Sequence, residues 1–236
     1  MLFSTFFFFE RVFLFVFLFI FLVYFGTYFA ILEEIKGIEW FTLFIMPIFL
    51  TVSYYLFYFL FPIRWLTRLP FIFVYGISFY AILLASNILN VKMERSLQLY
   101  RAAFSVNFFL QVVTIFLFCS SILSFHFDFL INSLIIGLVV FIFGLQLLWS
   151  TKMSEKIDKE IVSYALIIFL VIFQLSIFLS FIEIKTTIYS LFIATSYYSL
   201  GGLIYNWIDK RLFKETVREY LIVWGFIFLI LLLSVR

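Results

Sequence analysis

The side chains best suited to specific recognition in this 236-residue chain are basic and polar residues that stand between long apolar runs. An arginine can hold a phosphate or a carboxylate with two hydrogen bonds, so such residues suit a lipid headgroup or the surface of a partner protein. The candidates are Arg95, Gln98, Arg101, Arg211 and Lys214. The basic residues among them could equally be part of the excess of Lys and Arg that membrane proteins carry on their cytoplasmic side. In that case they would need no binding role.

Part of this set belongs to a polar stretch between two apolar runs. Its polar residues follow one another in steps of three and four, which places them on one face of a helix. They are Asn87, Asn90, Glu94, Gln98, Arg101 and Ser105. The spacing predicts an amphipathic connector. Neither Pro nor Gly occurs between Gly76 and Gly137, so we expect the chain to bend at the asparagines, which tolerate non-helical backbone and cap helices.

A second polar set lies inside an apolar run, at 188–208, which we expect to sit in the middle of a helix bundle. Together with Asn87 and Asn90 it supplies the candidate interior polar positions, namely Ser196, Tyr197, Ser199, Tyr205 and Asn206. Such side chains would line a pocket for an uncharged apolar or lipid-like molecule. They would equally serve as hydrogen bonds between packed helices or as caps at helix ends.

Residues able to carry catalysis are scarce. The single cysteine, Cys119, lies in an apolar run, and the single histidine, His126, lies in a short connector, so neither a thiolate cluster nor a histidine metal site can form. No zinc-protease, phosphate-loop or nucleophile-elbow motif is present. We therefore expect no catalytic residue, no metal and no cofactor, and we predict that the chain is not an enzyme.

Composition identifies the solvent that surrounds most of the chain. Hydrophobic residues make up 66% of it and charged residues 12%, whereas a soluble domain is roughly half apolar and about a quarter charged. All 29 charged residues lie in connectors or near the ends of apolar runs. Ion pumps and coupled carriers usually have charged residues buried in the membrane, so we do not expect this chain to belong to these classes. The apolar composition makes lipid the expected partner.

The apolar runs define the expected architecture, an all-α polytopic transmembrane bundle of seven or eight spans, with eight favoured, in one integral membrane domain covering 1–236. The predicted spans are 12–31, 41–61, 71–89, 104–123, 129–148, 161–181, 188–208 and 221–235. Between them, 32–40 reads as an acidic connector, 62–70 as a tight turn bracketed by prolines, and 209–220 as a charged helical connector with an Arg211–Glu215 pair. Gly137 and Gly144 share a face and favour close approach of another helix.

The connectors also predict orientation. If 32–40, 91–103, 150–160 and 209–219 share one side, that side holds 11 of the 16 basic residues and is the expected cytoplasmic side. We therefore predict a multi-pass protein of the cell (inner) membrane. Its expected role is structural, or the docking of another membrane or cytoplasmic protein through these connectors. No nucleic-acid partner is expected.

The stretch from Arg68 to Ala103 resembles a family of uncharacterised multi-pass membrane proteins from small-genome bacteria. In that family an asparagine-containing span end leads into an Arg-x2-Gln-x2-Arg-Ala-Ala-like connector, matched here by Arg95, Gln98, Arg101, Ala102 and Ala103. The resemblance covers about a fifth of the chain. It implies an integral membrane protein and carries no catalytic residue across.

Overall fold

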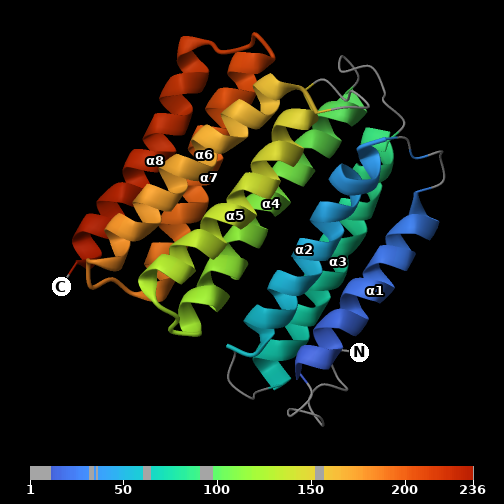
Figure 1. Ribbon diagram of the computed structural model, residues 1–236, viewed down its shortest axis with the longest axis horizontal. Coiled ribbons are helices and arrows are strands. Elements are labelled where there is room, and N and C mark those ends of the chain that lie inside the picture. Colours follow the sequence, from blue (N-terminus) through green and yellow to red (C-terminus); the bar gives the residue numbers. More distant parts are fainter. Residues whose placement is uncertain are drawn as a thin grey trace. The chain divides into compact units, whose positions relative to one another are not determined.

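A computed structural model describes residues 12–31, 35, 37–60, 65–90, 98–151 and 157–235. Within these ranges the chain forms helices joined by turns, with no strand (Figure 1). The helices are α1 (Val12–Ala30), α2 (Glu39–Tyr58), α3 (Trp65–Asn90), α4 (Gln98–Ser124), α5 (Phe129–Trp149), α6 (Lys159–Ser180), α7 (Thr186–Ile208) and α8 (Lys214–Ser234). The prediction of an all-α protein is confirmed, and each predicted span overlaps one helix.

Six of the helices in the described ranges are long and apolar enough to cross a membrane, namely α2, α3, α4, α5, α6 and α8. Twenty residues in a helix extend about 30 Å, the thickness of the hydrocarbon core. α1 has 19 residues and carries no charged side chain. α7 has 23 residues, and its many polar side chains lower its apolar content. The chain is therefore a multi-pass membrane protein, and the predicted count of seven or eight spans stays a prediction.

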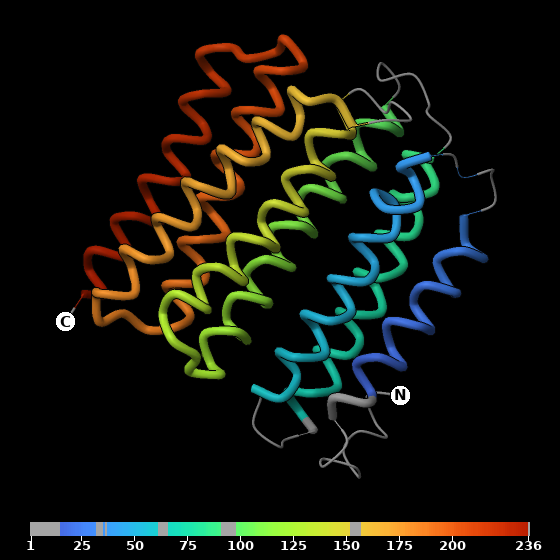
Figure 2. The backbone as a smooth tube through the Cα atoms, viewed as in Figure 1, coloured from blue at the N-terminus to red at the C-terminus, as the bar shows by residue number. Residues whose placement is uncertain are grey.

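The chain divides into two compact units, Met1–Thr114 and Ile115–Arg236. In the first unit, α2 packs against α1 and α3. The three helices run up, down and up, as the tube in Figure 2 shows. Short connections favour this antiparallel arrangement. The core of the unit is aromatic: Tyr55 and Tyr58 are buried against Phe15, Phe19 and Tyr75, among others.

In the second unit α5 packs most extensively against α6, and α7 contacts α5, α6 and α8. Two glycines explain the close approach of α5 and α6. A Cβ atom at Gly137 would lie 2.8 Å from the ring of Phe169, and one at Gly144 would lie 3.6 to 3.8 Å from Ile168 and Ala165. The predicted close approach at these glycines is thus confirmed. α7 has the inner position that its polar sequence suggested.

The predicted turn at 62–70 is wrong over its second part. α3 begins at Trp65 and contains Pro70. Pro70 is the sixth residue of α3, where proline removes one backbone hydrogen bond; membrane helices tolerate this because neighbouring groups satisfy the freed carbonyl. The acidic connector predicted at 32–40 is also too long, because α2 begins at Glu39. Glu39, which the prediction placed in that connector, is 1% exposed.

The helical connector predicted at 209–220 is wrong over its first part. α7 ends at Ile208, a turn follows, and α8 begins at Lys214. Arg211 therefore precedes the helix, and it forms an ion pair with Asp209 at 3.3 Å in place of the expected pair with Glu215. In the polar stretch before α4, α3 ends at Asn90 as expected, α4 begins at Gln98, and residues 91–97 lie outside the described part.

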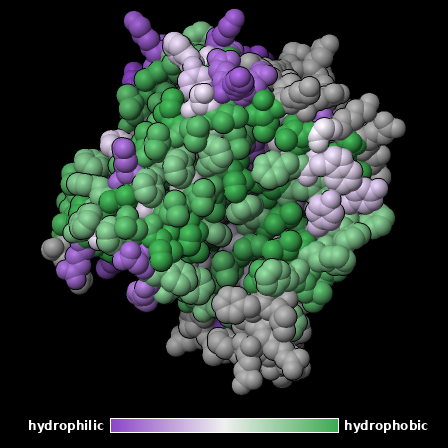
Figure 3. Space-filling model, in the orientation of Figure 1, coloured by the Kyte–Doolittle hydropathy of each residue, from purple (hydrophilic) through white to green (hydrophobic). Residues whose placement is uncertain are grey.

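Apolar side chains cover the outer faces of three helices. α8 buries Leu231 alone among its residues, and large apolar residues of α3 and α6 are exposed, including Phe73, Tyr80 and Phe178. On the face of the second unit shown in Figure 3, hydrophobic side chains form a band with hydrophilic side chains at its two ends. Such a band matches a bilayer with water on both sides.

Candidate functional site

The predicted contact residues are exposed wherever the structure describes them. Gln98 and Arg101 lie in the first turn of α4, and Arg211 and Lys214 lie where the α7–α8 turn meets α8, all four accessible to solvent. Arg95 lies outside the described residues. The two pairs belong to different units, and the structure describes each unit by itself.

Around the α7–α8 turn, two further basic side chains are exposed. Lys210 lies in the turn itself and Arg218 lies in the second turn of α8. Exposed acidic residues, Glu215 and Glu219, stand among them, so the surface has mixed charge with a small positive excess. A surface of this kind suits a small number of specific charge contacts better than a long-range field.

The polar side chains of α7 contact α8 or their own helix. The indole N–H of Trp224 donates a hydrogen bond to Ser196 Oγ at 3.0 Å, and the Ser199 hydroxyl donates to the backbone carbonyl of Tyr220 at 3.3 Å. The amide of Asn206 donates to the carbonyl of Gly202 at 2.7 Å. Tyr197 is fully buried and Tyr205 nearly so. The bonds of Ser196 and Ser199 to α8 are the interhelical hydrogen bonds expected in a membrane bundle.

Aromatic packing reinforces the same interface. The ring of Phe192 lies 5.6 Å from that of Trp224 and 6.0 Å from that of Phe228, and Tyr198 lies 5.0 Å from Tyr220. Aromatic pairs at such separations stabilise a contact by about 0.5–1.5 kcal/mol beyond burial alone. α8 is thus held to the second unit through α7, by paired rings and hydrogen bonds along one face.

A hydroxyl cluster joins α5, α6 and α7, and it consists of three buried residues, Ser133, Ser176 and Tyr189, together with the exposed Ser180. The Ser176 hydroxyl donates to Ser133 Oγ at 3.0 Å, and the Tyr189 hydroxyl donates to the Ser176 carbonyl at 2.6 Å. Ser180 donates to the same carbonyl at 2.8 Å. Sequence reasoning missed this cluster because its members come from three helices. The one available signal was the i, i+4 spacing of the two serines on α6.

The hydroxyl cluster is not built for nucleophilic catalysis. A serine or tyrosine nucleophile needs a base within hydrogen-bond reach, and the partners of these four side chains are one another and a backbone carbonyl. Within the described ranges, no group of three or more His, Cys, Asp or Glu side chains could hold a metal ion. The cluster therefore acts as a hydrogen-bonded clasp between helices.

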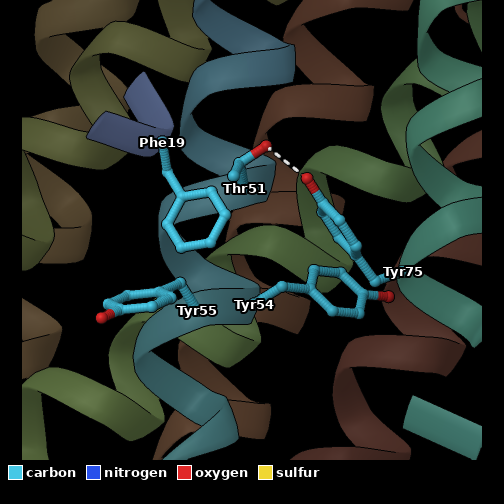
Figure 4. Close-up of a pocket in the computed structure, with 5 residues that line it drawn as sticks. All are labelled: Phe19, Thr51, Tyr54, Tyr55 and Tyr75. Carbon is cyan, nitrogen blue, oxygen red and sulfur yellow. Dashed lines mark hydrogen bonds between the residues drawn. The ribbon is translucent and has the colours of Figure 1, made fainter. Parts of the chain in front are cut away.

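A small void lies between the helices of the first unit, lined by Phe19, Thr51, Tyr54, Tyr55 and Tyr75 (Figure 4). Its volume is about 10 Å³, and a single water molecule needs roughly 10–15 Å³ of such space. Thr51 and Tyr75 point toward each other across it, with 3.0 Å between their hydroxyl oxygens. The void has no room for a lipid or an aromatic ligand.

The remaining candidate interior residues, Asn87 and Asn90, lie in the last turn and a half of α3. Asn90 is buried, with 6% of its surface exposed, and Asn87 is half-buried. The amide oxygen and nitrogen of Asn90 and the amide oxygen of Asn87 are buried without a hydrogen-bond partner.

Comparison of this chain with protein-family models, with curated proteins and with solved structures finds no match.

Proposed function

We propose that this chain is a structural or partner-docking protein of the cell (inner) membrane, which holds a partner protein through the exposed charged residues at the α7–α8 turn. The observation that carries the proposal is that the inner polar residues and the exposed basic residues of α7, α8 and their turn make different contacts. Their inner polar groups are used for packing against each other, whereas Lys210, Arg211 and Lys214 remain exposed.

The ion pair at this turn leaves the arginine available. Arg211 bonds to Asp209 through its Nε atom, and 48% of its side chain is exposed. The planar guanidinium has five N–H groups, so the remaining ones suit a carboxylate on a partner. The proposal therefore expects a partner with acidic side chains at its contact surface and binding that weakens as salt rises.

The alternative, a carrier or binder of an uncharged apolar or lipid-like molecule, receives less support from α7. Two of the residues expected to line its pocket, Ser196 and Ser199, bond to α8. The void lined by Thr51 and Tyr75 lies in the other unit and is water-sized. The resemblance to an uncharacterised membrane family remains a further proposal and fits either role.

The experiment is a photo-crosslinking comparison in native membranes. The double variant Arg211→Gln/Lys214→Gln removes two charges at the proposed surface, and Lys185→Gln removes an exposed charge at the opposite end of α7. We expect one crosslinked partner with the wild-type chain and with Lys185→Gln, and its loss with the double variant, while all three insert equally. Equal crosslinking in all three chains, or none in any, would contradict the proposal.

A further inference from the structure

Aromatic rings form a continuous column where the end of α1 meets the start of α2. Tyr28 stacks on Trp40 with 5.8 Å between the ring centroids, and Trp40 stacks on Phe44 at 5.7 Å. The ring of Tyr24 lies 4.9 Å from that of Phe44. We call Tyr24, Tyr28, Trp40 and Phe44 the aromatic column. Since each ring contacts the next, the column is one surface built by two helices.

Three of the four rings are open to the surroundings of the protein. Phe44 is buried, whereas Tyr24, Tyr28 and Trp40 are 37%, 46% and 41% exposed. In the described part of the chain, the contacts of Tyr28 and Trp40 are ring contacts. The Tyr28 hydroxyl and the Trp40 indole N–H therefore have no hydrogen-bond partner among the described residues, and both can donate to a group outside the protein.

The column lies where both helices reach the border of the bilayer. Tyr28 is in the last turn of α1 and Trp40 is in the first turn of α2, and these two helix ends lie at the same end of the unit in Figure 1. α2 is long and apolar enough to cross a membrane, so its first turn lies near one border. The connector between the helices contains Glu33, Glu34 and Lys36, which hydrocarbon excludes. The column therefore lies between hydrocarbon and water.

The exposed side chains of α1 change in polarity toward this end. They are apolar in the middle of the helix, at Phe17 and Phe21, and they gain hydroxyl groups toward its end, at Tyr24 and Tyr28. Beside Tyr28, the Phe29 ring is 74% exposed and has no polar atom, so this end stays in partly apolar surroundings. Charged residues begin only after the helix. This order matches hydrocarbon, headgroups and water, and it favours lipid as the partner.

We propose that the aromatic column anchors this end of the first unit in the headgroup layer of the bilayer. The Trp40 indole N–H and the Tyr28 hydroxyl donate hydrogen bonds to phosphate or ester oxygen atoms of the lipids, and the rings cover the headgroup end of the acyl chains. The ring contacts limit the movement of each side chain. Because the rings come from both helices, the anchor sets the depth of α1 and α2 together.

The first test measures the depth of Trp40 by fluorescence quenching in phosphatidylcholine liposomes. The lipid carries bromine either near the headgroup end or near the methyl end of its acyl chains. The chain has five tryptophans, so the difference between wild type and Trp40→Phe gives the Trp40 signal. We expect bromine near the headgroup to quench this signal roughly two-fold more, since interfacial rings lie at that level. Equal or stronger quenching by the deep bromine, or quenching by aqueous acrylamide alone, would overturn the proposal.

A probe in the middle of α1 is the control for depth. Phe21→Trp in the Trp40→Phe chain places an indole ring at an exposed position of the same helix. Its signal should respond more to the deep bromine, because the middle of a spanning helix lies among the acyl chains. The opposite order would place α1 along the membrane surface, and the column would then mark no border between hydrocarbon and headgroups.

The second test addresses the hydrogen bonds to lipid. Tyr28→Phe keeps the ring and removes the hydroxyl, and we expect it to lower the unfolding temperature in phospholipid nanodiscs by roughly 2–4 °C. Tyr80→Phe is the matched control, because Tyr80 is 66% exposed in the middle part of α3, a helix able to cross the membrane. It should not lower the unfolding temperature. No loss with Tyr28→Phe, or an equal loss in both variants, would refute the bond from Tyr28 to the headgroups.

Discussion

The phenol ring of Tyr220 in α8 occupies the space that a Cβ atom at Gly202 in α7 would need. The ring also packs against Tyr198, with 5.0 Å between the ring centroids. Glycine at this position therefore determines how closely α8 lies against α7, as small residues do at helix contacts in membranes.

Gly202→Ala should weaken the α7–α8 interface. The new methyl group would displace the Tyr220 ring from its contact with Tyr198, and overpacking of this kind costs about 1–3 kcal/mol. We expect a lower unfolding temperature in detergent. The control is Gly225→Ala on α8, where no heavy atom lies within 4 Å of the added Cβ. It should leave stability unchanged or raise it slightly, because alanine favours helix. Equal losses in both variants would contradict the prediction.

Ser176→Ala should destabilise the clasp between α5, α6 and α7. The substitution removes the donor to Ser133 and a partner of Tyr189, and a hydrogen bond of this type contributes roughly 1 kcal/mol. The matched control on the same helix is Ser163→Ala, an exposed serine that bonds to the Lys159 carbonyl. Thermal unfolding should separate the two variants. Identical unfolding temperatures would mean that the clasp contributes nothing.

The helices could be predicted from sequence, because an apolar run long enough to cross a bilayer has few alternatives to a helix. Their ends could not be placed as well. Pro70 reads as a turn residue, yet it lies in α3, since transmembrane helices tolerate proline where neighbouring groups satisfy the freed carbonyl. The sequence places Glu39 in a connector, yet it begins α2 and is buried, because burial depends on neighbouring helices that periodicity does not reveal.

The candidate site was less predictable than the fold. Ser196 and Ser199 were recognised as interior residues, but their partners, Trp224 and the Tyr220 carbonyl, belong to a helix whose position the sequence does not fix. The clasp around Tyr189 required three helices to be placed at once. The spacing of residues in the sequence shows which face of a helix a residue occupies. It does not show which residue of another helix lies opposite, so contacts between distant segments can be assigned only from the packed structure.

Thr51→Val should destabilise the first unit by about 1 kcal/mol. The single hydroxyl proton of Thr51 goes to the Pro47 carbonyl, at 2.8 Å, so Tyr75 must donate to Thr51 Oγ1, at 3.0 Å. Valine keeps the shape and leaves the Tyr75 hydroxyl without its acceptor. Thr195→Val is the control, because Thr195 bonds to its own helix, at the Leu191 carbonyl. Thermal unfolding should show the larger loss for Thr51→Val, and the reverse order would refute the role given to Tyr75.

Lys210→Gly should stabilise the end of α7. Lys210 has φ of 57°, in the left-handed region that costs an L-residue about 1–2 kcal/mol. Its N–H bonds to the Trp207 carbonyl at 3.1 Å and that of Arg211 to the Asn206 carbonyl at 2.9 Å, the pattern of a helix end closed by glycine. Glycine also gains freedom in the unfolded chain, so we expect a net gain of about 0.5–1 kcal/mol by thermal unfolding. Lys210→Val should lose stability instead, because a β-branched residue resists this backbone. A gain with valine, or a loss with glycine, would show that backbone strain at Lys210 does not limit the stability of this turn.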